Sequence, residues 1–187
     1  MPETDEEIAA RVQRGDRESF AVLVERYEAK MLRYARKFLL GYEDAQDLVQ
    51  QVFLKAYVNI NSFHTARRFS PWLYRIAHNE FLNAIKKRGR EPILFFDPDT
   101  LFPHPIAKER PDHELDDKEL RIILEECLNE LDVKYREPLV LYFFEDLRYQ
   151  EIAEIMHVPV STVGIRLKRG KDMLRHIYNK RHPSYGQ

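Results

Sequence analysis

The residues best suited to chemistry lie between Leu147 and Arg175, where cations follow a short apolar pattern. In the second half of this stretch, over residues 166–175, five basic side chains recur against a single acidic one, Asp172: Arg166, Lys168, Arg169, Lys171 and Arg175. A row of cations neutralises phosphates, and side chains near the start of such a helix can reach base edges. These residues favour a surface for duplex DNA over the alternative, a solvated charged helix that only packs on its neighbour.

A short helix, a tight turn and a second helix would have to position these cations. The first helix is marked by apolar residues at helical spacing: Ile152, Ala153, Ile155 and Met156. His157-Val158-Pro159 interrupts that pattern, and Ser161 is expected to cap the second helix. The second helix is expected to turn Val163, Leu167 and Leu174 inward. Its cations would then point toward solvent. The pattern predicts a helix-turn-helix.

A second basic cluster is interleaved with aromatic residues. Its cations are Arg67, Arg68, Arg75, Lys86, Lys87, Arg88 and Arg90. Its aromatic residues are Phe63, Phe69, Trp72, Tyr74 and Phe81. Cations beside rings suit a single strand, because unstacked bases lie on rings while the backbone meets charge. The alternative is that Trp72, Ile76 and Phe81, at helical spacing, belong to the hydrophobic core. The polar segment Asn59–Phe69 is harder to explain as core.

A third group has the character of a surface stripe. Asp44, Asp47 and Gln51 share one face of a helix, next to Gln50, while Leu48 and Phe53 are expected to be buried. Such a stripe is either solvated surface or the contact site of a partner.

Nothing in the chain favours catalysis or a bound cofactor. The seven histidines are scattered without a metalloprotease or nucleophile motif, and no glycine-rich phosphate loop is present. The single cysteine, Cys127, excludes an intramolecular disulfide and cysteine-based metal sites. No apolar run approaches membrane-spanning length, so no membrane segment is expected. Together these observations lead us to expect a cytoplasmic protein without a metal or a cofactor.

The 187 residues divide into two expected domains of an all-α fold. Residues 92–117 contain five prolines and carry two basic against seven acidic side chains, a net charge of −5. We therefore expect domains at 1–90 and 113–182, an extended acidic linker at 91–112 and a tail at 183–187. A first helix is expected to begin after a Thr4–Glu7 capping box and to end near Gly15. Further helices are expected over 17–41, 43–60, 70–89, 120–131 and 139–144.

Five motifs resemble segments of the sigma-70 family of bacterial initiation factors. Asp44–Phe53 (DAQDLVQQVF) and Phe69–Asn79 (FSPWLYRIAHN) resemble its conserved-core and promoter-melting segments. Tyr135–Leu141, Tyr149–Ile155 and Pro159–Val163 resemble its fourth-region helix-turn-helix. The short two-domain layout is similar to the extracytoplasmic-function (ECF) subgroup.

This resemblance implies a factor that binds core RNA polymerase and reads two promoter elements, with an anti-sigma protein as a further expected partner. Contacts with core polymerase would come from Asp44, Asp47, Leu48, Gln50, Gln51 and Phe53. Contacts with the melted minus-ten strand would come from Asn59, Ser62, Phe63, Arg67, Arg68, Phe69, Trp72, Arg75, Asn79, Lys86 and Lys87. Contacts with the minus-thirty-five duplex would come from Ser161, Thr162, Gly164, Ile165, Arg166, Lys168, Arg169, Lys171 and Arg175.

The chain departs from the family pattern at three places. Gln51 replaces a usual glutamate, and Gly164-Ile165 replaces a usual basic–serine pair, so base preference does not carry over. His157 stands at a turn position that is usually glycine. Two other readings stay open: a one-component helix-turn-helix regulator, and an all-helical adaptor or enzyme whose charged helices are only solvated surface.

Overall fold

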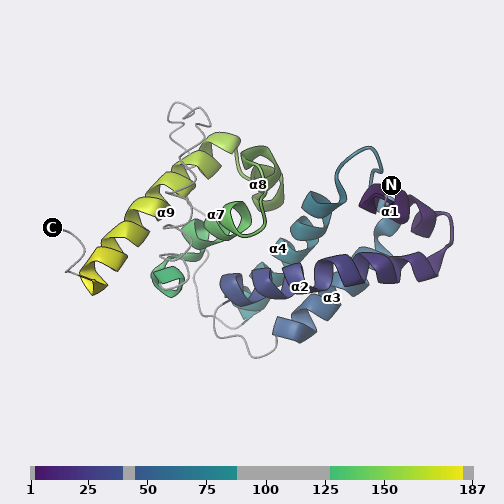
Figure 1. Ribbon diagram of the computed structural model, residues 1–187, viewed down its shortest axis with the longest axis horizontal. Helices are drawn as coiled ribbons and strands as arrows, with labels where there is room; N and C mark the ends of the chain where they lie inside the picture. The colour runs from purple at the N-terminus through teal and green to yellow at the C-terminus, as the bar shows by residue number, and fades with distance from the viewer. Residues whose placement is uncertain (1–2, 40–44, 88–126, 183–187) are drawn as a thin grey trace. The chain divides into compact units, whose positions relative to one another are not determined.

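The computed structural model in Figure 1 describes residues 3–39, 45–87 and 127–182, and every regular element in these ranges is helical. They form two compact units, one made of α1 to α4 and one made of α7 to α9. An all-α fold was the sequence prediction, and it is confirmed. None of the helices in the described ranges is long and apolar enough to cross a membrane. Asp44, Arg88, Arg90, the predicted linker 91–112 and the tail 183–187 lie outside these ranges.

The first unit contains α1 (Asp5–Gln13), α2 (Phe20–Leu39), α3 (Ala45–Val58) and α4 (Phe69–Lys87), with 3₁₀ turns at Arg17–Ser19 and Ile60–Ser62. The predicted capping box opens α1, because Thr4 Oγ1 accepts from the Glu7 N–H and Glu7 accepts from the Thr4 N–H. Gly15 follows α1 with φ of +103°, as its predicted role as a stop requires.

Aromatic rings fill the hydrophobic core of this unit. Tyr34 stacks on Phe38 and meets the rings of Tyr74 and Phe81, with ring centroids 5.2 to 5.5 Å apart. All four side chains are at most 2% exposed. The core therefore joins the second half of α2 to α4 and holds the two long helices together.

The second unit contains a 3₁₀ turn at Leu128–Glu130, then α7 (Val133–Phe143), α8 (Tyr149–Met156) and α9 (Val160–Arg181). Helix α7 is buried along almost its whole length and packs against α9. The contact is close at Gly170, where an added Cβ would stand 2.8 Å from Leu139 Cδ1. Of the predicted helix over 120–131, the described part holds only the 3₁₀ turn, and the rest lies outside the described ranges.

Three predicted helix starts were wrong. Helix α7 begins at Val133 and not at residue 139, because Asp132 caps it by accepting the Lys134 N–H. The other two starts were wrong by one or two residues. Helix α4 begins at Phe69 instead of after a Ser70 cap, and the Phe69 N–H is satisfied by Glu6 Oε1 of α1 at 2.8 Å. Helix α9 begins at Val160, so Ser161 lies inside the first turn and does not cap it. Pro159 supplies the start instead, because its carbonyl accepts the N–H groups of Thr162 and Val163.

His157 occupies the turn between α8 and α9 in a left-handed conformation, with φ of 56° and ψ of 42°. The positive φ that was expected for this usually glycine position is thus present. We predict that His157→Val lowers the free energy of unfolding of the full chain by about 1–2 kcal/mol, because a β-branched side chain is strained there. His157→Asn should be close to neutral, since asparagine tolerates this region. Urea unfolding checks both, and equal stability of the two variants would contradict the prediction.

Candidate nucleic-acid interface

The cations of α9 divide into an exposed group and one buried residue. Lys168, Arg169 and Arg175 are exposed and Lys171 is half-buried, as a DNA-facing surface requires. Arg166 is only 7% exposed, so the prediction that it faces solvent was wrong. At 100° per residue Arg166 lies about 160° around the helix from Lys168, which turns it toward the packed side.

The rest of the predicted duplex-reading set also separates by exposure. Ser161, Gly164 and Ile165 are half-buried and lie in the first two turns of α9, on the side of Lys168. Thr162 is 1% exposed and belongs to the packed side with Val163 and Leu167. Thr162 and Arg166 therefore do not share the exposed side of α9 with the rest of the predicted set.

The two glycines of α9 have opposite surroundings. A Cβ on Gly164 would meet only Tyr149 Cε2 at 3.8 Å, an ordinary contact, whereas a Cβ on Gly170 would meet the fully buried Leu139 at 2.8 Å. We predict that Gly164→Ala stabilises the chain by roughly 1 kcal/mol through helix propensity. Gly170→Ala should destabilise it by roughly 1–2 kcal/mol, because overpacking exceeds that gain. Thermal unfolding of the two variants tests the contrast, which fails if both shift the melting temperature the same way.

A second candidate interface is the segment Asn59–Phe69, which connects α3 to α4. Its exposed residues are Asn59, Asn61, Ser62, His64, Thr65, Ala66, Arg67 and Arg68. Two of its polar side chains have backbone partners: Asn59 Nδ2 donates to the Lys55 carbonyl and Ser62 Oγ to the Asn59 carbonyl, each at 2.8 Å. The segment therefore has a defined path and presents two adjacent arginines to solvent.

The aromatic members of the predicted minus-ten set lie underneath this segment. Phe63, Phe69 and Trp72 are 1 to 8% exposed, and their ring centroids are 5.3 to 5.4 Å apart. These three rings pack on one another, so they do not offer free faces for stacked bases in this conformation. The alternative reading of Trp72 and Phe81 as core residues is confirmed. The exposed cations, and not the rings, form the surface.

Helix α4 continues this surface with polar side chains. Arg75, Asn79 and Lys86 recur at spacings of four and seven on one face, with Arg75 half-buried and the other two exposed. Lys87 is exposed on an adjacent face. On α3, Lys55 makes a 2.5 Å ion pair with Glu80 of α4, which removes the main acidic group of α4 from competition.

The exposed face of α3 is a third surface and has a mixed character. Asp47, Gln50 and Gln51 are exposed as predicted, while Phe53 is 8% exposed and Leu48 is half-buried. The expectation that Phe53 is buried is confirmed, so its ring packs inward and does not lie on the exposed face. The same face also exposes Leu54 (64%) and Val58 (68%), which the sequence analysis did not single out. Their spacing of four, in register with Gln50 and Gln51, is the signal that could have found them. We refer to Asp47, Gln50, Gln51, Leu54 and Val58 as the α3 face.

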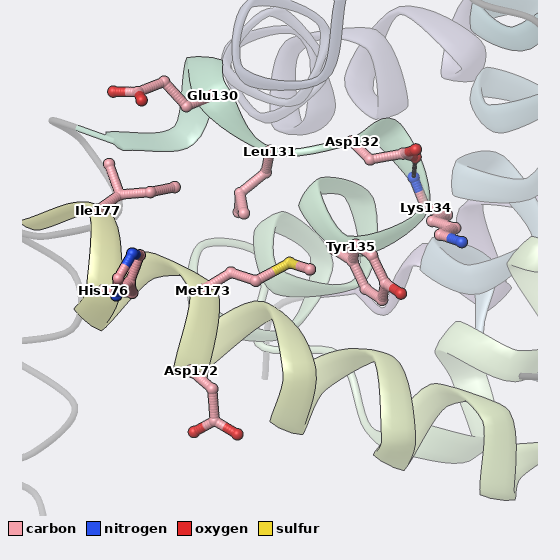
Figure 2. A pocket seen from close by; sticks show the side chains of 9 residues that line it. All are labelled: Glu130, Leu131, Asp132, Lys134, Tyr135, Asp172, Met173, His176 and Ile177. Atoms are coloured by element: carbon pink, nitrogen blue, oxygen red, sulfur yellow. Dashed lines mark hydrogen bonds between the residues drawn. The ribbon is translucent and has the colours of Figure 1, made fainter.

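A pocket of about 580 Å³ opens beside α9 in the second unit (Figure 2). Leu131, Tyr135, Met173 and Ile177 give it an apolar lining, and its remaining lining is polar: Glu130, Asp132, Lys134, Asp172 and His176. Met173 and Ile177 lie on another side of α9 from Lys168 and Lys171, whereas Arg169 lies one turn before Met173 on the same side of the helix. No group of three His, Cys, Asp or Glu side chains suited to a metal ion occurs in the part of the chain that the structure describes.

Comparison with known families and proteins agrees with this geometry. The Sigma-70 region 2 family model matches residues 23–91, and the model described as Sigma-70, region 4 matches residues 121–174. The ECF RNA polymerase sigma factor SigW of Bacillus subtilis is 34% identical over 88% of this chain and 91% of its own. The ECF RNA polymerase sigma-E factor of Haemophilus influenzae is 36% identical over 96% of each chain.

Solved structures share the fold over most of the chain. The structure of CnrH in complex with the cytosolic domain of CnrY covers 95% of this chain and 99% of its own, with a TM-score of 0.69 and 23% identity. RpoE of Bartonella quintana, in complex with the anti-sigma factor NepR, covers 87% and 98%, with a TM-score of 0.64 and 23% identity. The two matched regions and the near-full-length relatives at 34% and 36% identity establish the family. The chain belongs to the ECF RNA polymerase sigma factors of the sigma-70 family.

Proposed function

We propose that this sigma factor uses three separate surfaces in initiation: the α3 face for core polymerase, the segment Asn59–Phe69 with α4 for the melted minus-ten strand, and α9 for the minus-thirty-five duplex. The observation that carries the proposal is that both units expose cations, on the irregular segment Asn59–Phe69 in one unit and on the helix α9 in the other. A lone helix suits the major groove, whereas an irregular segment with adjacent arginines suits a single strand.

On α9 the proposal assigns base reading to the N-terminal half. Ser161, Gly164 and Ile165 lie there with Lys168 and Arg169, while Lys171 and Arg175 follow in the later turns. A recognition helix contacts base edges with its first turns, and cations further along meet the phosphates. Gly164 has no side chain, so the backbone of the duplex can approach α9 closely between Ser161 and Lys168.

In the first unit the proposal assigns strand capture to Arg67, Arg68, Arg75, Asn79 and Lys86. Arg67 and Arg68 lie in the segment Asn59–Phe69, and Arg75, Asn79 and Lys86 follow on one face of α4; all five are exposed or half-buried. Phe63, Phe69 and Trp72 would support the segment as packed core residues. A nucleotide base could reach the face of one of these rings only if one of the three side chains moved.

The proposal for core polymerase rests on the chemistry of the α3 face. One carboxylate, two amides and two exposed aliphatic side chains suit a protein partner, because apolar area supplies affinity and a charge selects orientation. The chain would supply binding and no catalytic chemistry or cofactor of its own, and it would act in the cytoplasm with the polymerase. The alternative of a one-component regulator is not favoured by the family.

We also propose that an anti-sigma protein antagonises this chain. Two solved structures of the same fold are complexes, one of CnrH with the cytosolic domain of CnrY and one of RpoE with the anti-sigma factor NepR. Nothing in the described residues identifies the partner, so the proposal extends to the class of protein only.

Selection of DNA from a randomised library tests the proposal. Core polymerase with this chain should retain duplexes that carry two sequence blocks at a fixed spacing, whereas core polymerase alone should retain none of them. A single block, or retention by the chain without polymerase, would contradict the proposal and favour the one-component regulator.

A further inference from the structure

Helix α1 holds the segment Asn59–Phe69 near both of its ends. The Gln13 side-chain amide donates both protons, one to the Ile60 carbonyl and one to the Phe63 carbonyl, at 2.8 Å each. At the other end, Glu6 Oε1 accepts the Phe69 N–H at 2.8 Å. These bonds link residues 47 to 63 positions apart in the chain. Two side chains of one short helix therefore fix where the segment begins and ends. Figure 1 shows α1 beside the connection between α3 and α4.

Helix α1 is itself fastened to α2. The Tyr27 hydroxyl and the Arg26 guanidinium both donate to the Asp5 carboxylate, at 2.6 Å each, and Arg26 also donates to the Glu3 carbonyl. Burial, reinforced by the bond to Asp5, raises the pKa of Tyr27 well above its usual range, so the phenol keeps the proton that it donates. Helix α1 thus has a fixed position from which to hold the segment.

Between the anchors the segment has little structure of its own. His64 to Arg68 are all exposed. Inside this stretch the Arg67 N–H donates to the His64 carbonyl at 2.9 Å, and the Ala66 N–H donates to His64 Nδ1 at 3.3 Å. The buried rings of Phe63 and Phe69 flank it. Gln13 and Glu6 therefore hold the backbone on both sides of Arg67 and Arg68.

We propose that Gln13 and Glu6 are positioning residues for strand capture. Helix α1 would hold the segment Asn59–Phe69 in place without itself touching DNA. This inference rests on the proposed role of the segment Asn59–Phe69. Losing the two Gln13 bonds lets the segment shift, and a shift of about 1 Å is enough to weaken a preorganised site. Duplex binding by α9, in the other unit, should not change.

The variants separate positioning from general destabilisation. Gln13→Glu keeps the shape but replaces two donors by acceptors, and Gln13→Lys restores donors of similar reach. Glu6→Gln keeps an acceptor for the Phe69 N–H, whereas Glu6→Ala removes it. Leu39→Ala is the stability control, since Leu39 is 4% exposed and lies roughly 18 Å along α2 from Tyr27.

The experiment measures promoter opening by holoenzyme on a duplex selected by the wild-type factor, with permanganate reactivity as the readout. A separate assay measures holoenzyme affinity for a duplex that carries only the upstream element. We expect Gln13→Glu and Glu6→Ala to lower opening by about tenfold at unchanged upstream affinity. Gln13→Lys and Glu6→Gln should recover most of it, and Leu39→Ala should change opening less than twofold.

Unchanged opening with Gln13→Glu, while the wild-type factor opens the promoter, would overturn the inference and leave the proposed function standing. Equal losses for Gln13→Glu and Leu39→Ala would also overturn it, because the effect would then be one of stability. Failure of the wild-type holoenzyme to open the selected duplex would instead overturn the proposed function, and with it this inference.

Discussion

Arg169→Ala is expected to change which minus-thirty-five sequences the holoenzyme prefers, whereas Arg175→Ala should weaken all sequences alike. Arg169 is exposed in the N-terminal half of α9, within reach of base edges, and Arg175 lies more than one turn further on. Loss of a base-reading arginine costs about 1–3 kcal/mol on the preferred site and relaxes discrimination there. Loss of a phosphate contact lowers the slope of log affinity against log salt by about one.

Competition binding at two salt concentrations, on the selected promoter and on single-base variants of it, measures both quantities. Arg166→Ala is the internal control, because this residue is 7% exposed. We expect it to lower stability by about 2–3 kcal/mol, as removal of a buried charged group that has a partner does, without a change of base preference. Uniform loss of affinity in both Arg169→Ala and Arg175→Ala would show that sequence is read elsewhere.

Leu54→Asp is expected to weaken binding to core polymerase by tenfold or more. Leu54 is 64% exposed beside Val58 at 68%, so an aspartate there leaves the fold intact while it removes apolar area from the α3 face. Truncation of a buried interface anchor typically costs about 1–2 kcal/mol or more, which is at least five- to thirtyfold in affinity. Asp47→Lys, which reverses the one charge of this face, should weaken binding in the same direction.

Val22→Asp is the matched control for this prediction. Val22 is also an exposed aliphatic residue of the first unit, at 39%, but it lies on α2. Fluorescence anisotropy of labelled factor with core polymerase gives the affinities, and circular dichroism checks that helix content is kept. Full affinity in both Leu54→Asp and Asp47→Lys would remove the α3 face from the proposal.

The sequence predicted the helices well because local signals determine them. The Thr4–Glu7 capping box, Gly15 and the apolar spacing along α2 are all read within a few residues, and each appears where it was expected. The starts of α4 and α9 were less predictable. Glu6 satisfies the first N–H of α4 from 63 residues away, and no local pattern contains that contact.

The candidate sites predicted from the sequence differ from the structure in the exposure of particular side chains. Arg166 was assigned to the surface because it is a cation, although Val163, Leu167 and Leu174 define an inward direction that lies only about 80° from it. Phe63, Phe69 and Trp72 were assigned to a strand because rings can stack on bases, whereas their burial depends on tertiary packing. Leu54 and Val58 were passed over because apolar residues on a helix are expected to be buried.

Permanganate footprinting of a selected promoter, combined with run-off transcription, tests most directly whether this chain directs core polymerase to open DNA. The account predicts reactive thymines at the downstream element, and a defined transcript, only when the chain and core polymerase are both present. Single-strand reactivity and transcript should fall together when either promoter element is scrambled. The account is contradicted if the chain binds the duplex by itself and changes transcription only through another initiation factor.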